Sequence, residues 1–362
     1  MKVLFIVSTL KATGPTTQLY NLISNLDRSR FEPCVLTLSP EPADSRWKAF
    51  AALEVELLSL NLSRIQGIWK AKHGLRKVID VLAPDIIHTQ GIRADGLMSR
   101  SKSGIPWVMT ARNFPPADYP TKFGKVKGGM MVKQHFSIMK RCKHLVTCSE
   151  TIQKQFADVG ISGQAIQNGV NLSATTGADG SVLKEYAKPI YVSVGSLIPR
   201  KNMSFIIKAF SSLPEKQRGS LVILGDGPQK EQLESLRVKG VILPGNVSNV
   251  ADYLAGADYF VSASLSEGLP NTVLEALASG LPAILSNIQS HQEIADVASR
   301  ACKLFSLSEG TTALQRAMLE APRDFDDESR EDAKNSAYDN FSAQKMSMHY
   351  QDLYNSIVVG EK

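Results

Sequence analysis

The stretch from Ala257 to Ser286, ADYFVSASLSEGLPNTVLEALASGLPAILS, constrains the fold of this chain more than any other. Two short β-prone runs, Tyr259–Val261 and Pro282–Leu285, predict two buried strands. Between them Pro270 suits the first turn of a helix, where its missing N–H costs nothing, and Gly280 is expected to end that helix. A strand, a loop, a helix and a second strand in this order predict a parallel α/β sheet.

The loop before that helix carries the residues with the clearest chemical meaning. Glu267 and Gly268 lie in the loop, and Glu275 follows about two turns into the helix. A helix N-terminus attracts anions because its first amides are unpaired and its dipole is positive there. Two carboxylates around such a site suit a ligand that carries phosphate and sugar hydroxyls. The alternative is a solvated capping Glu beside a helix-surface Glu.

Strand and helix patterns alternate along the whole chain, and 362 residues exceed the usual size of one hydrophobic core. We therefore expect two α/β domains, residues 1–172 and 173–341, with a C-terminal helix over residues 342–362. The stretch Asn171–Lys188 is poor in large apolar residues and is the expected linker. The predicted strands are Lys2–Ser8, Cys34–Leu38, Val55–Leu58, Asp85–His88, Trp107–Ala111, Leu145–Cys148, Ala165–Gln167, Ile190–Val194, Leu221–Leu224 and Val241–Leu243. The predicted helices include Ile65–Leu82, Val126–Lys140, Asn202–Phe210, Gln229–Val238 and Val247–Ala255.

The charge is unevenly distributed. Residues 1–172 hold 23 Lys and Arg against 12 Asp and Glu, a net of +11, and the remainder has a net of −5. The basic half is expected to meet an anionic partner, and without a nucleic-acid motif a membrane surface or lipid phosphate fits better than nucleic acid. No apolar run is long enough to span a bilayer. The four cysteines form no C-x-x-C pair, which favours a reduced, cytoplasmic setting.

The sequence SEGLPNTVLEALASGLP resembles the signature of retaining nucleotide-sugar glycosyltransferases of the family-4 type. The resemblance implies the GT-B fold, in which two Rossmann-like domains face each other across a cleft. It also implies that the C-terminal helix, residues 342–362, crosses back to the first domain. It further implies that Glu267 holds donor-sugar hydroxyls and that Glu275 holds the ribose. Backbone groups near the helix start would bind the diphosphate, namely those of Gly268, Leu269, Pro270, Asn271 and Thr272.

A second segment, VGSLIPRKN, follows the predicted strand Ile190–Val194 and resembles the family's diphosphate clamp. Ser196 stands where many relatives have Arg, so the resemblance assigns the clamp to Arg200 and Lys201, with Gly195 at the strand end. Arg grips phosphate bidentately and Lys supplies a point charge. The alternative is a solvated basic turn. Gly225 and Gly14 lie in two further strand-to-helix turns that resemble donor-binding loops.

Two strand ends in the first domain resemble reaction-centre segments of the family. The stretch DIIHTQG contains His88, a candidate catalytic residue whose alternative is a hydrogen-bonded strand-end histidine. The stretch VMTARNF places Arg112 where many relatives carry His, followed by Asn113, and we assign both to the acceptor side. An Arg cannot accept a proton at neutral pH, but it can bind a phosphate.

The stretch Tyr119–His144 holds seven basic residues from Lys122 to Lys143, no acidic residue, and interleaved Phe, Val, Ile and Met. This pattern is typical of a basic amphipathic helix at a membrane interface. The alternative is an ordinary sheet-packed helix with a solvated basic face.

Together these features predict a retaining, metal-independent glycosyltransferase with Glu267, Arg200, Lys201 and His88 as catalytic residues. It would transfer a sugar from a nucleoside-diphosphate-sugar, expected to be a UDP-sugar, to a glycan or lipid-linked acceptor in cell-surface polysaccharide biosynthesis. No cofactor, metal or nucleic acid is expected. The expected location is the cytoplasm, peripherally on the inner membrane face. The alternatives are a UDP-sugar 2-epimerase-like isomerase and a catalytically silent GT-B partner protein.

Overall fold

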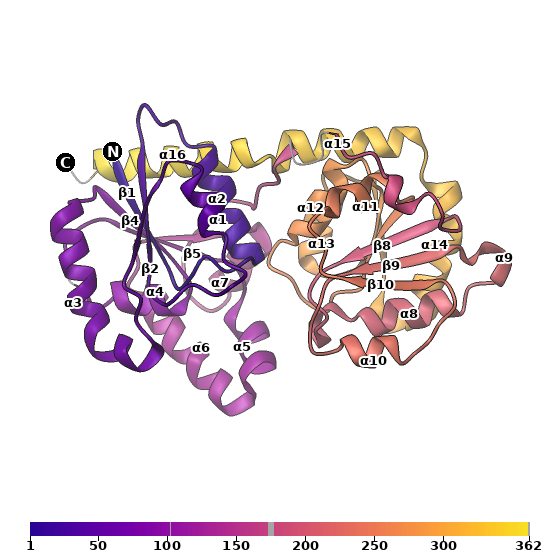
Figure 1. Cartoon of the computed structure of the whole chain (residues 1–362), viewed down its shortest axis with the longest axis horizontal. Coiled ribbons are helices and arrows are strands. Elements are labelled where there is room, and N and C mark those ends of the chain that lie inside the picture. The colour runs from indigo at the N-terminus through magenta and orange to yellow at the C-terminus, as the bar shows by residue number, and fades with distance from the viewer. Residues whose placement is uncertain (102, 173–176, 361–362) are drawn as a thin grey trace. The chain divides into compact units, whose positions relative to one another are not determined.

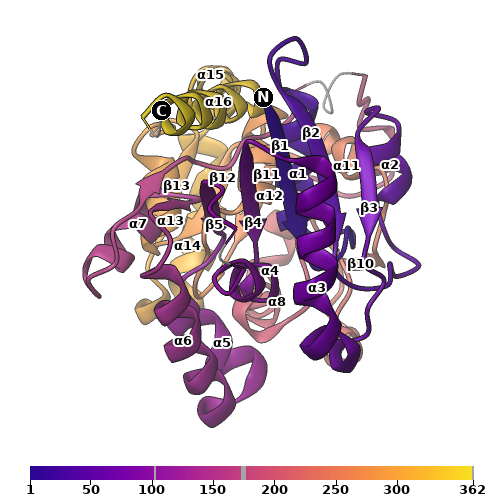
Figure 2. The same cartoon turned by 90° about the vertical axis from the view of Figure 1, so that its left-hand side faces the viewer.

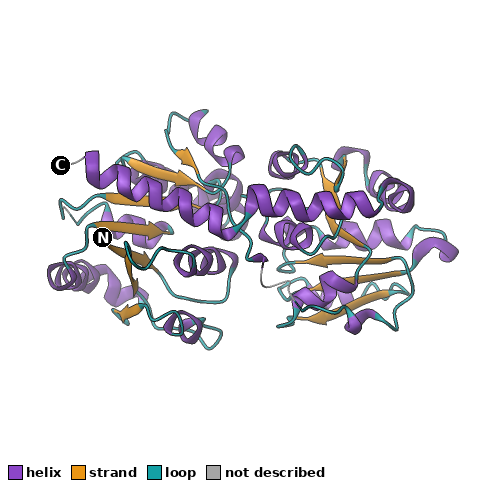
Figure 3. Cartoon of the chain, turned by 90° about the horizontal axis from the view of Figure 1, so that it is seen from above, coloured by secondary structure: helices purple, strands orange, loops and turns teal. Residues whose placement is uncertain are grey.

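The computed structural model describes residues 1–101, 103–172 and 177–360 of the chain. It divides into two compact units: unit 1 comprises Met1–Gly169 and the segment from Ala343, and unit 2 comprises Val170–Ser342. Each unit contains one parallel sheet with helices packed against it (Figure 1, Figure 3). The expected α/β fold class is thereby confirmed.

Unit 1 is built on a seven-stranded parallel sheet in the order β3-β2-β1-β4-β5-β6-β7 (Figure 2). Apart from the edge strands β3 and β7, its strands are short and largely apolar runs that are buried on both faces, as is typical of parallel sheets. The strand order reverses between β1 and β4, and ligands of open α/β sheets bind beyond the strand ends at such a point. The strands are β1 Lys2–Val7, β2 Glu32–Thr37, β3 Glu56–Ser59, β4 Ile86–Gln90, β5 Trp107–Ala111, β6 His144–Thr147 and β7 Gln164–Ala165.

The helices of unit 1 cover both faces of this sheet (Figure 2). They are α1 Gly14–Ser24, α2 Trp47–Ala51, α3 Arg64–Leu82, α4 Ile92–Met98, α5 Pro115–Phe123, α6 Lys125–Met139, α7 Glu150–Ala157 and α16 Ala343–Gly360. The last of them, drawn yellow in Figure 1, comes from the end of the chain. Tyr350 and Tyr354 of α16 are fully buried in the unit 1 core with Phe5 and Phe31, which fixes this helix on unit 1.

Unit 2 is built on a six-stranded parallel sheet in the order β10-β9-β8-β11-β12-β13, with its own reversal between β8 and β11. The strands are β8 Ile190–Val194, β9 Ser220–Leu224, β10 Val241–Gly245, β11 Tyr259–Ser262, β12 Ala283–Ser286 and β13 Cys302–Phe305. The α-helices are α8 Met203–Ser211, α9 Glu215–Arg218, α10 Lys230–Glu234, α11 Val250–Gly256, α12 Asn271–Ala278, α13 Gln289–Ala295, α14 Thr311–Asp324 and α15 Asp327–Phe341. Short 3₁₀ turns form η2 Ser181–Leu183, η3 Pro199–Lys201 and η4 Leu307–Glu309.

Two sequence expectations need correction. Part of the expected linker Asn171–Lys188, residues 173–176, lies outside the described residues. Beyond it the chain packs on unit 2, because Leu183 of η2 is buried in the unit 2 core and Gly180 lies against the backbone of Gly256. A count of apolar residues cannot detect one anchoring leucine.

The second correction concerns the basic stretch around α6. It is not one continuous amphipathic helix, because α5 ends before Gly124, whose φ of +79° lies in the left-handed region. The apolar residues of α6 also divide: Ile138 and Met139 are buried in the core of unit 1, whereas Val126 and Met130 are exposed. Among the described helices, none is both long and apolar enough to cross a membrane.

Candidate functional site

In unit 2 the candidate residues meet at the point where the strand order reverses. Arg200 and Lys201 form η3 in the loop after β8, and Glu267 lies in the loop after β11. Since β8 and β11 are neighbouring parallel strands, their following loops lie side by side at the carboxyl edge of the sheet. Residues 67 positions apart in sequence are thus brought into contact.

Glu267 lies at the centre of this cluster. Its Oε2 is 2.6 Å from Arg200 Nη1, its Oε1 is 2.7 Å from Lys201 Nζ, and the Ser264 hydroxyl donates to Oε1 at 2.7 Å. Burial alone would raise the pKa of Glu267, but the charges of Lys201 and Arg200 outweigh it and lower the pKa to about 2. The carboxylate therefore stays ionised and holds both cations in fixed positions.

Two buried nitrogen atoms of this cluster have no partner within the described ranges. They are Nε of Arg200 and Nε2 of His291. Burial lowers the pKa of His291 to about 4, so its imidazole is neutral, and Nδ1–H donates to the Ser286 carbonyl at 2.8 Å. A buried donor without a partner is costly in a native structure. The Arg200 N–H therefore marks a position where a ligand oxygen would be favourable.

Glu275 lies on α12, which begins directly after Pro270. Pro270 thus stands at the N-cap, one residue earlier than expected, and the helix ends before Gly280, whose φ is +70°. Burial raises the pKa of Glu275 to about 7, and the charge of Lys201 offsets part of that effect. The two glutamates therefore differ: Glu267 is ionised at neutral pH, whereas Glu275 titrates near neutrality.

Glycine at two strand ends makes the cluster possible. A Cβ on Gly225, whose φ is +136°, would lie 2.0 Å from the Gly195 carbonyl oxygen. At Gly195, with φ of +155°, a Cβ would lie 3.2 Å from Cε of Lys201. Both positions therefore have a packing reason to be glycine, and Gly195 leaves room for the lysine that reaches Glu267.

Unit 1 contains a cavity of about 410 Å³ at the carboxyl ends of β1, β4 and β5. The expected acceptor-side residues Arg112 and Asn113 line it, as do Thr13 and Pro15, the neighbours of Gly14 at the start of α1. The polar residues that line it include Lys11, Gln90, Arg112, Asn113, Asp118, Lys122 and His135. The apolar or aromatic residues that line it include Leu19, Ile92, Tyr119, Phe123 and Met131. The cavity thus combines cationic and apolar surfaces.

His88 is not among the residues that line this cavity. It is fully buried, its Nδ1 lies 2.7 Å from the Tyr354 hydroxyl, and its Nε2 lies 2.7 Å from Oγ1 of Thr110. Burial, with the nearby charge of Arg112, lowers the pKa of His88 to about 3. The geometry therefore favours the alternative of a neutral, hydrogen-bonded core histidine that ties β4 to α16.

A buried chain of polar groups, which no sequence motif indicates, leads from the cavity lining to Asp95. Tyr119 OH lies 2.7 Å from His135 Nδ1, and His135 Nε2 lies 3.0 Å from Asp95 Oδ2. Asp95 is buried, and this burial raises the pKa of its carboxyl group, an effect that His135 partly offsets. These residues come from α5, α6 and α4, and no short sequence motif joins them. The chain of bonds fixes the position of the Tyr119 ring in the cavity.

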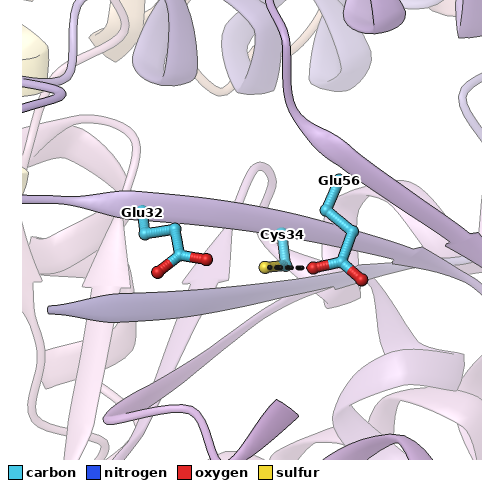
Figure 4. Close-up of side chains that lie close together, drawn as sticks. All are labelled: Glu32, Cys34 and Glu56. Carbon is cyan, nitrogen blue, oxygen red and sulfur yellow. Dashed lines mark hydrogen bonds between the residues drawn. The ribbon is translucent and has the colours of Figure 1, made fainter.

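The side chains of one further cluster lie close enough together to be considered as ligands of a cation. Glu32, Cys34 and Glu56 lie together on β2 and β3 (Figure 4). However, Glu32 pairs with Lys2 at 3.3 Å, and the Cys34 thiol donates to Glu56 at 3.4 Å. Burial raises the pKa of that thiol to about 12, so it is protonated and a poor metal ligand. The ion pair with Lys2 and the Cys34–Glu56 hydrogen bond account for the positions of these side chains, and no ion is needed to explain them.

The sequence matches two family models. The model described as Glycosyltransferase Family 4 covers residues 12–174, and the model described as Glycosyl transferases group 1 covers residues 188–323. These ranges cover most of unit 1 and most of unit 2.

Two curated proteins illustrate the similarity. The putative teichuronic acid biosynthesis glycosyltransferase TuaC of Bacillus subtilis is 30% identical over 225 residues, which is 57% of this chain. The alignment spans 54% of TuaC, so the chain covers about half the length of that relative. The UDP-Gal:alpha-D-GlcNAc-diphosphoundecaprenol alpha-1,3-galactosyltransferase of Escherichia coli is 28% identical over 265 residues, covering 66% of this chain and 67% of that protein.

Among solved structures, Anabaena Alr3699/HepE in complex with UDP is similar over 98% of this chain and 100% of its own. The TM-score is 0.81 at 15% sequence identity. At this identity the similarity shows the fold, and it shows that both parallel α/β units belong to the GT-B type.

Proposed function

Because this chain belongs to the group 1, family-4 glycosyltransferases, we propose that it is a retaining enzyme that transfers a sugar from a UDP-sugar to a glycan acceptor. The process it serves would be cell-surface polysaccharide biosynthesis. The alternatives of an epimerase-like isomerase and a silent partner protein are outcomes of the test below.

The observation that carries the proposal is the cluster of Arg200, Lys201 and Glu267 in unit 2. Two cations held at 2.6 and 2.7 Å by one buried carboxylate form a preorganised positive site, and Arg200 Nε adds a buried unpaired donor among the described residues. The β-phosphate of a nucleotide-sugar supplies the oxygens that such donors prefer. The donor-side backbone of Gly268–Thr272 and the Glu275 carboxylate would complete the site.

In the proposed reaction the bond between the anomeric carbon and the diphosphate breaks, and the acceptor oxygen forms the new bond to that carbon. The departing phosphate oxygen takes the acceptor's proton, so no protein base is needed. Arg200 and Lys201 would stabilise the charge that develops on the leaving group, a role that metal ions serve in other transferases. A buried His88 and a permanently charged Arg112 are consistent with a reaction without a protein base.

The acceptor would enter the cavity of unit 1 and would be lipid-linked. The E. coli relative acts, by its name, on a diphosphoundecaprenol-linked sugar. The cavity supports such an acceptor because its lining includes both the cations Arg112 and Lys122 and the apolar side chains Phe123 and Met131.

The reaction would then take place at a membrane. Two exposed patches of unit 1 support peripheral attachment of the protein to it. At the junction of α5 and α6, Val126 is 78% exposed between exposed Lys125 and Lys127, and Met130, which is 62% exposed, follows about one turn later. Apolar side chains flanked by lysines suit an anionic headgroup layer.

The first turns of α3 offer a second surface of the same kind. Ile65, Ile68 and Trp69 are exposed there, Trp69 to 82%, next to exposed Lys70 and Lys72. Since α3 follows β3 and α5 follows β5, both surfaces lie toward the carboxyl edge of the same parallel sheet. We propose that both rest on the cytoplasmic face of the membrane.

The test is a binding and hydrolysis screen against UDP-, GDP- and ADP-sugars without metal. We expect one UDP-sugar to bind at micromolar strength and to be slowly hydrolysed, and Lys201→Ala and Glu267→Ala to lose both activities. Lys208→Ala, a change of an exposed lysine on α8, is the matched control and should behave as wild type. Release of an epimerised sugar would instead identify an isomerase, and no binding of any donor would leave the silent partner.

A further inference from the structure

Gln90, which lines the unit 1 cavity, carries an NH₂ group without a hydrogen-bond partner among the described residues. Gln90 is the last residue of β4 and Arg112 follows β5, and these strands are neighbours, with Gln90 opposite Thr110. Both side chains line the cavity. Two residues 22 positions apart are thus placed together by the register of the sheet.

The orientation of the Gln90 amide is fixed by Arg112. Its Oε1 lies 3.4 Å from both Nε and Nη2 of the guanidinium, so oxygen must face Arg112 and Nε2 must be the other end. Gln90 is only 7% exposed, and within the described ranges Nε2 has no hydrogen-bond partner. A buried NH₂ group with two donors and no acceptor therefore lies at the cavity wall.

The hydrogen-bond partners of Arg112 within the described residues do not neutralise its charge. Nη1 donates to Asn168 Oδ1 at 2.7 Å, and the remaining bonds go to Gln90, so these acceptors are uncharged amides. These bonds use three of the five guanidinium N–H groups. The carboxylate that lines the cavity, Asp118, is already engaged by Asn113 at 2.5 Å and Lys122 at 2.7 Å.

We propose that Gln90 and Arg112 bind an anionic group of the acceptor, a phosphate or a carboxylate. This inference rests on the proposed function, and it adds the chemical class of the acceptor. A neutral sugar hydroxyl satisfies one or two donors and leaves the guanidinium charge uncompensated. A phosphate or carboxylate offers several acceptor oxygens in the planar arrangement that a guanidinium recognises, and it neutralises the charge. The source would be the phosphate of a lipid carrier or the acid group of a uronic acid.

The experiment is a calorimetric titration of the full-length protein with inorganic pyrophosphate and with D-glucuronate, and with D-glucose as the neutral reference. Saturating UDP is present throughout, so that the proposed diphosphate site of unit 2 is already occupied. We expect one or both anions to bind wild type and glucose not to bind. Pyrophosphate alone would identify a phosphate as the recognised group, and glucuronate alone would identify a carboxylate.

Two variants test the residues. Arg112→Gln removes the charge, and Gln90→Glu keeps the shape but pairs Arg112 with a carboxylate. Each should weaken anion binding by at least about tenfold, the effect expected for a charged hydrogen bond. Lys77→Gln, which removes an exposed charge on α3 that does not line the cavity, should change it by less than about threefold. Should Arg112→Gln fail to fold, Gln90→Glu decides.

Absence of anion binding to wild type, or equal affinities in wild type and Arg112→Gln, would overturn the inference. UDP affinity is measured on every variant as well, because the proposed diphosphate cluster of Arg200, Lys201 and Glu267 lies in unit 2. Normal UDP binding together with unaltered anion binding would refute the Gln90–Arg112 site and leave the proposed function standing. If wild type does not bind UDP, the proposed function is refuted. The anion titration is then run without UDP, and comparison of wild type with Arg112→Gln still tests the Gln90–Arg112 site.

Discussion

Arg200 Nη1 lies 2.6 Å from Glu267 Oε2, across 67 residues of sequence. The pair forms because the loops after β8 and β11 are neighbours where the strand order of unit 2 reverses. A buried carboxylate is tolerated there only because two cations neutralise it. The same pair that would bind the donor thus also contributes to the stability of unit 2, and its two roles can be separated by pH.

The first prediction concerns acid stability. The pKa of Glu267 is about 2 in the folded protein and 4.5 in an unfolded chain, so its stabilising effect is present above pH 4.5 and is lost as the pH falls toward 2. Glu267→Gln should therefore be less stable than wild type at pH 7 by on the order of 2 kcal/mol. The difference should shrink between pH 4.5 and 3.

Hydrogen exchange of unit 2 peptides is the suitable measurement, because Trp47, Trp69 and Trp107, the three tryptophans of the chain, lie in unit 1. Glu231→Gln, at an exposed position on α10, is the control and should show no such difference. A stability difference that stays constant from pH 7 to pH 3 would contradict the assigned pKa.

The second prediction concerns donor binding. Glu275 has a pKa raised to about 7, and an ionised carboxylate accepts hydrogen bonds from ribose hydroxyls better than a protonated one. UDP affinity should therefore rise several-fold from pH 6 to pH 8 in wild type. Glu275→Gln should bind UDP more weakly, by about tenfold, with no such rise. A pH profile identical in the two proteins would assign the titration to another group.

The third prediction follows from the same pKa and concerns stability. Since the folded pKa of Glu275 lies above the unfolded value of 4.5, the stability it provides is present below pH 4.5 and is lost as the pH rises through about 7. Glu275→Gln removes the free-energy cost of burying an ionised carboxylate at high pH. At pH 8 it should be more stable than wild type, by on the order of 1 kcal/mol, although it binds UDP less well. Exchange of α12 peptides would measure this, and a destabilised Glu275→Gln would count against it.

The fourth prediction separates a structural from a catalytic His88. Tyr354→Phe removes the hydroxyl that lies 2.7 Å from His88 Nδ1 and leaves a buried nitrogen without its partner. It should destabilise unit 1 by about 1–3 kcal/mol, while kcat changes less than about threefold. Tryptophan fluorescence reports this unit, and Tyr338→Phe, at an exposed tyrosine of unit 2, is the control. A large fall in kcat at unchanged stability would instead support a catalytic role for His88.

The fifth prediction concerns the membrane. The double variant Val126→Ser with Met130→Ser should bind anionic vesicles of phosphatidylglycerol at least about tenfold more weakly than wild type in co-sedimentation. The matched control replaces Leu236 and Val297, two exposed apolar residues of unit 2, by Ser and should keep wild-type binding. Raising the salt concentration should weaken binding of the wild type. Equal loss in both double variants would remove α6 from the membrane contact.

Local patterns in the sequence were sufficient to predict most of the elements. Strand β8, Ile190–Val194, occurs where its apolar run predicts it, and α3 begins one residue before the predicted Ile65. Such elements are fixed by short-range periodicity and burial, which a linear sequence records. The break at Gly124 and the η2 anchor Leu183 were not predicted, because each depends on one residue whose role is set by distant neighbours.

The residues of the candidate sites fall into the same two groups, those predicted from local motifs and those that depend on the tertiary structure. The sequence by itself predicted from local motifs that Glu267, Arg200 and Lys201 belong to one donor site, and the structure brings the three side chains into contact. Only the tertiary structure decided that His88 is a core residue, that Tyr119, His135 and Asp95 form one buried chain, and that Gln90 meets Arg112. The physical reason is that burial and hydrogen-bond partners come from strand order and register. These bring residues from separate strands and helices together, and no local pattern encodes them.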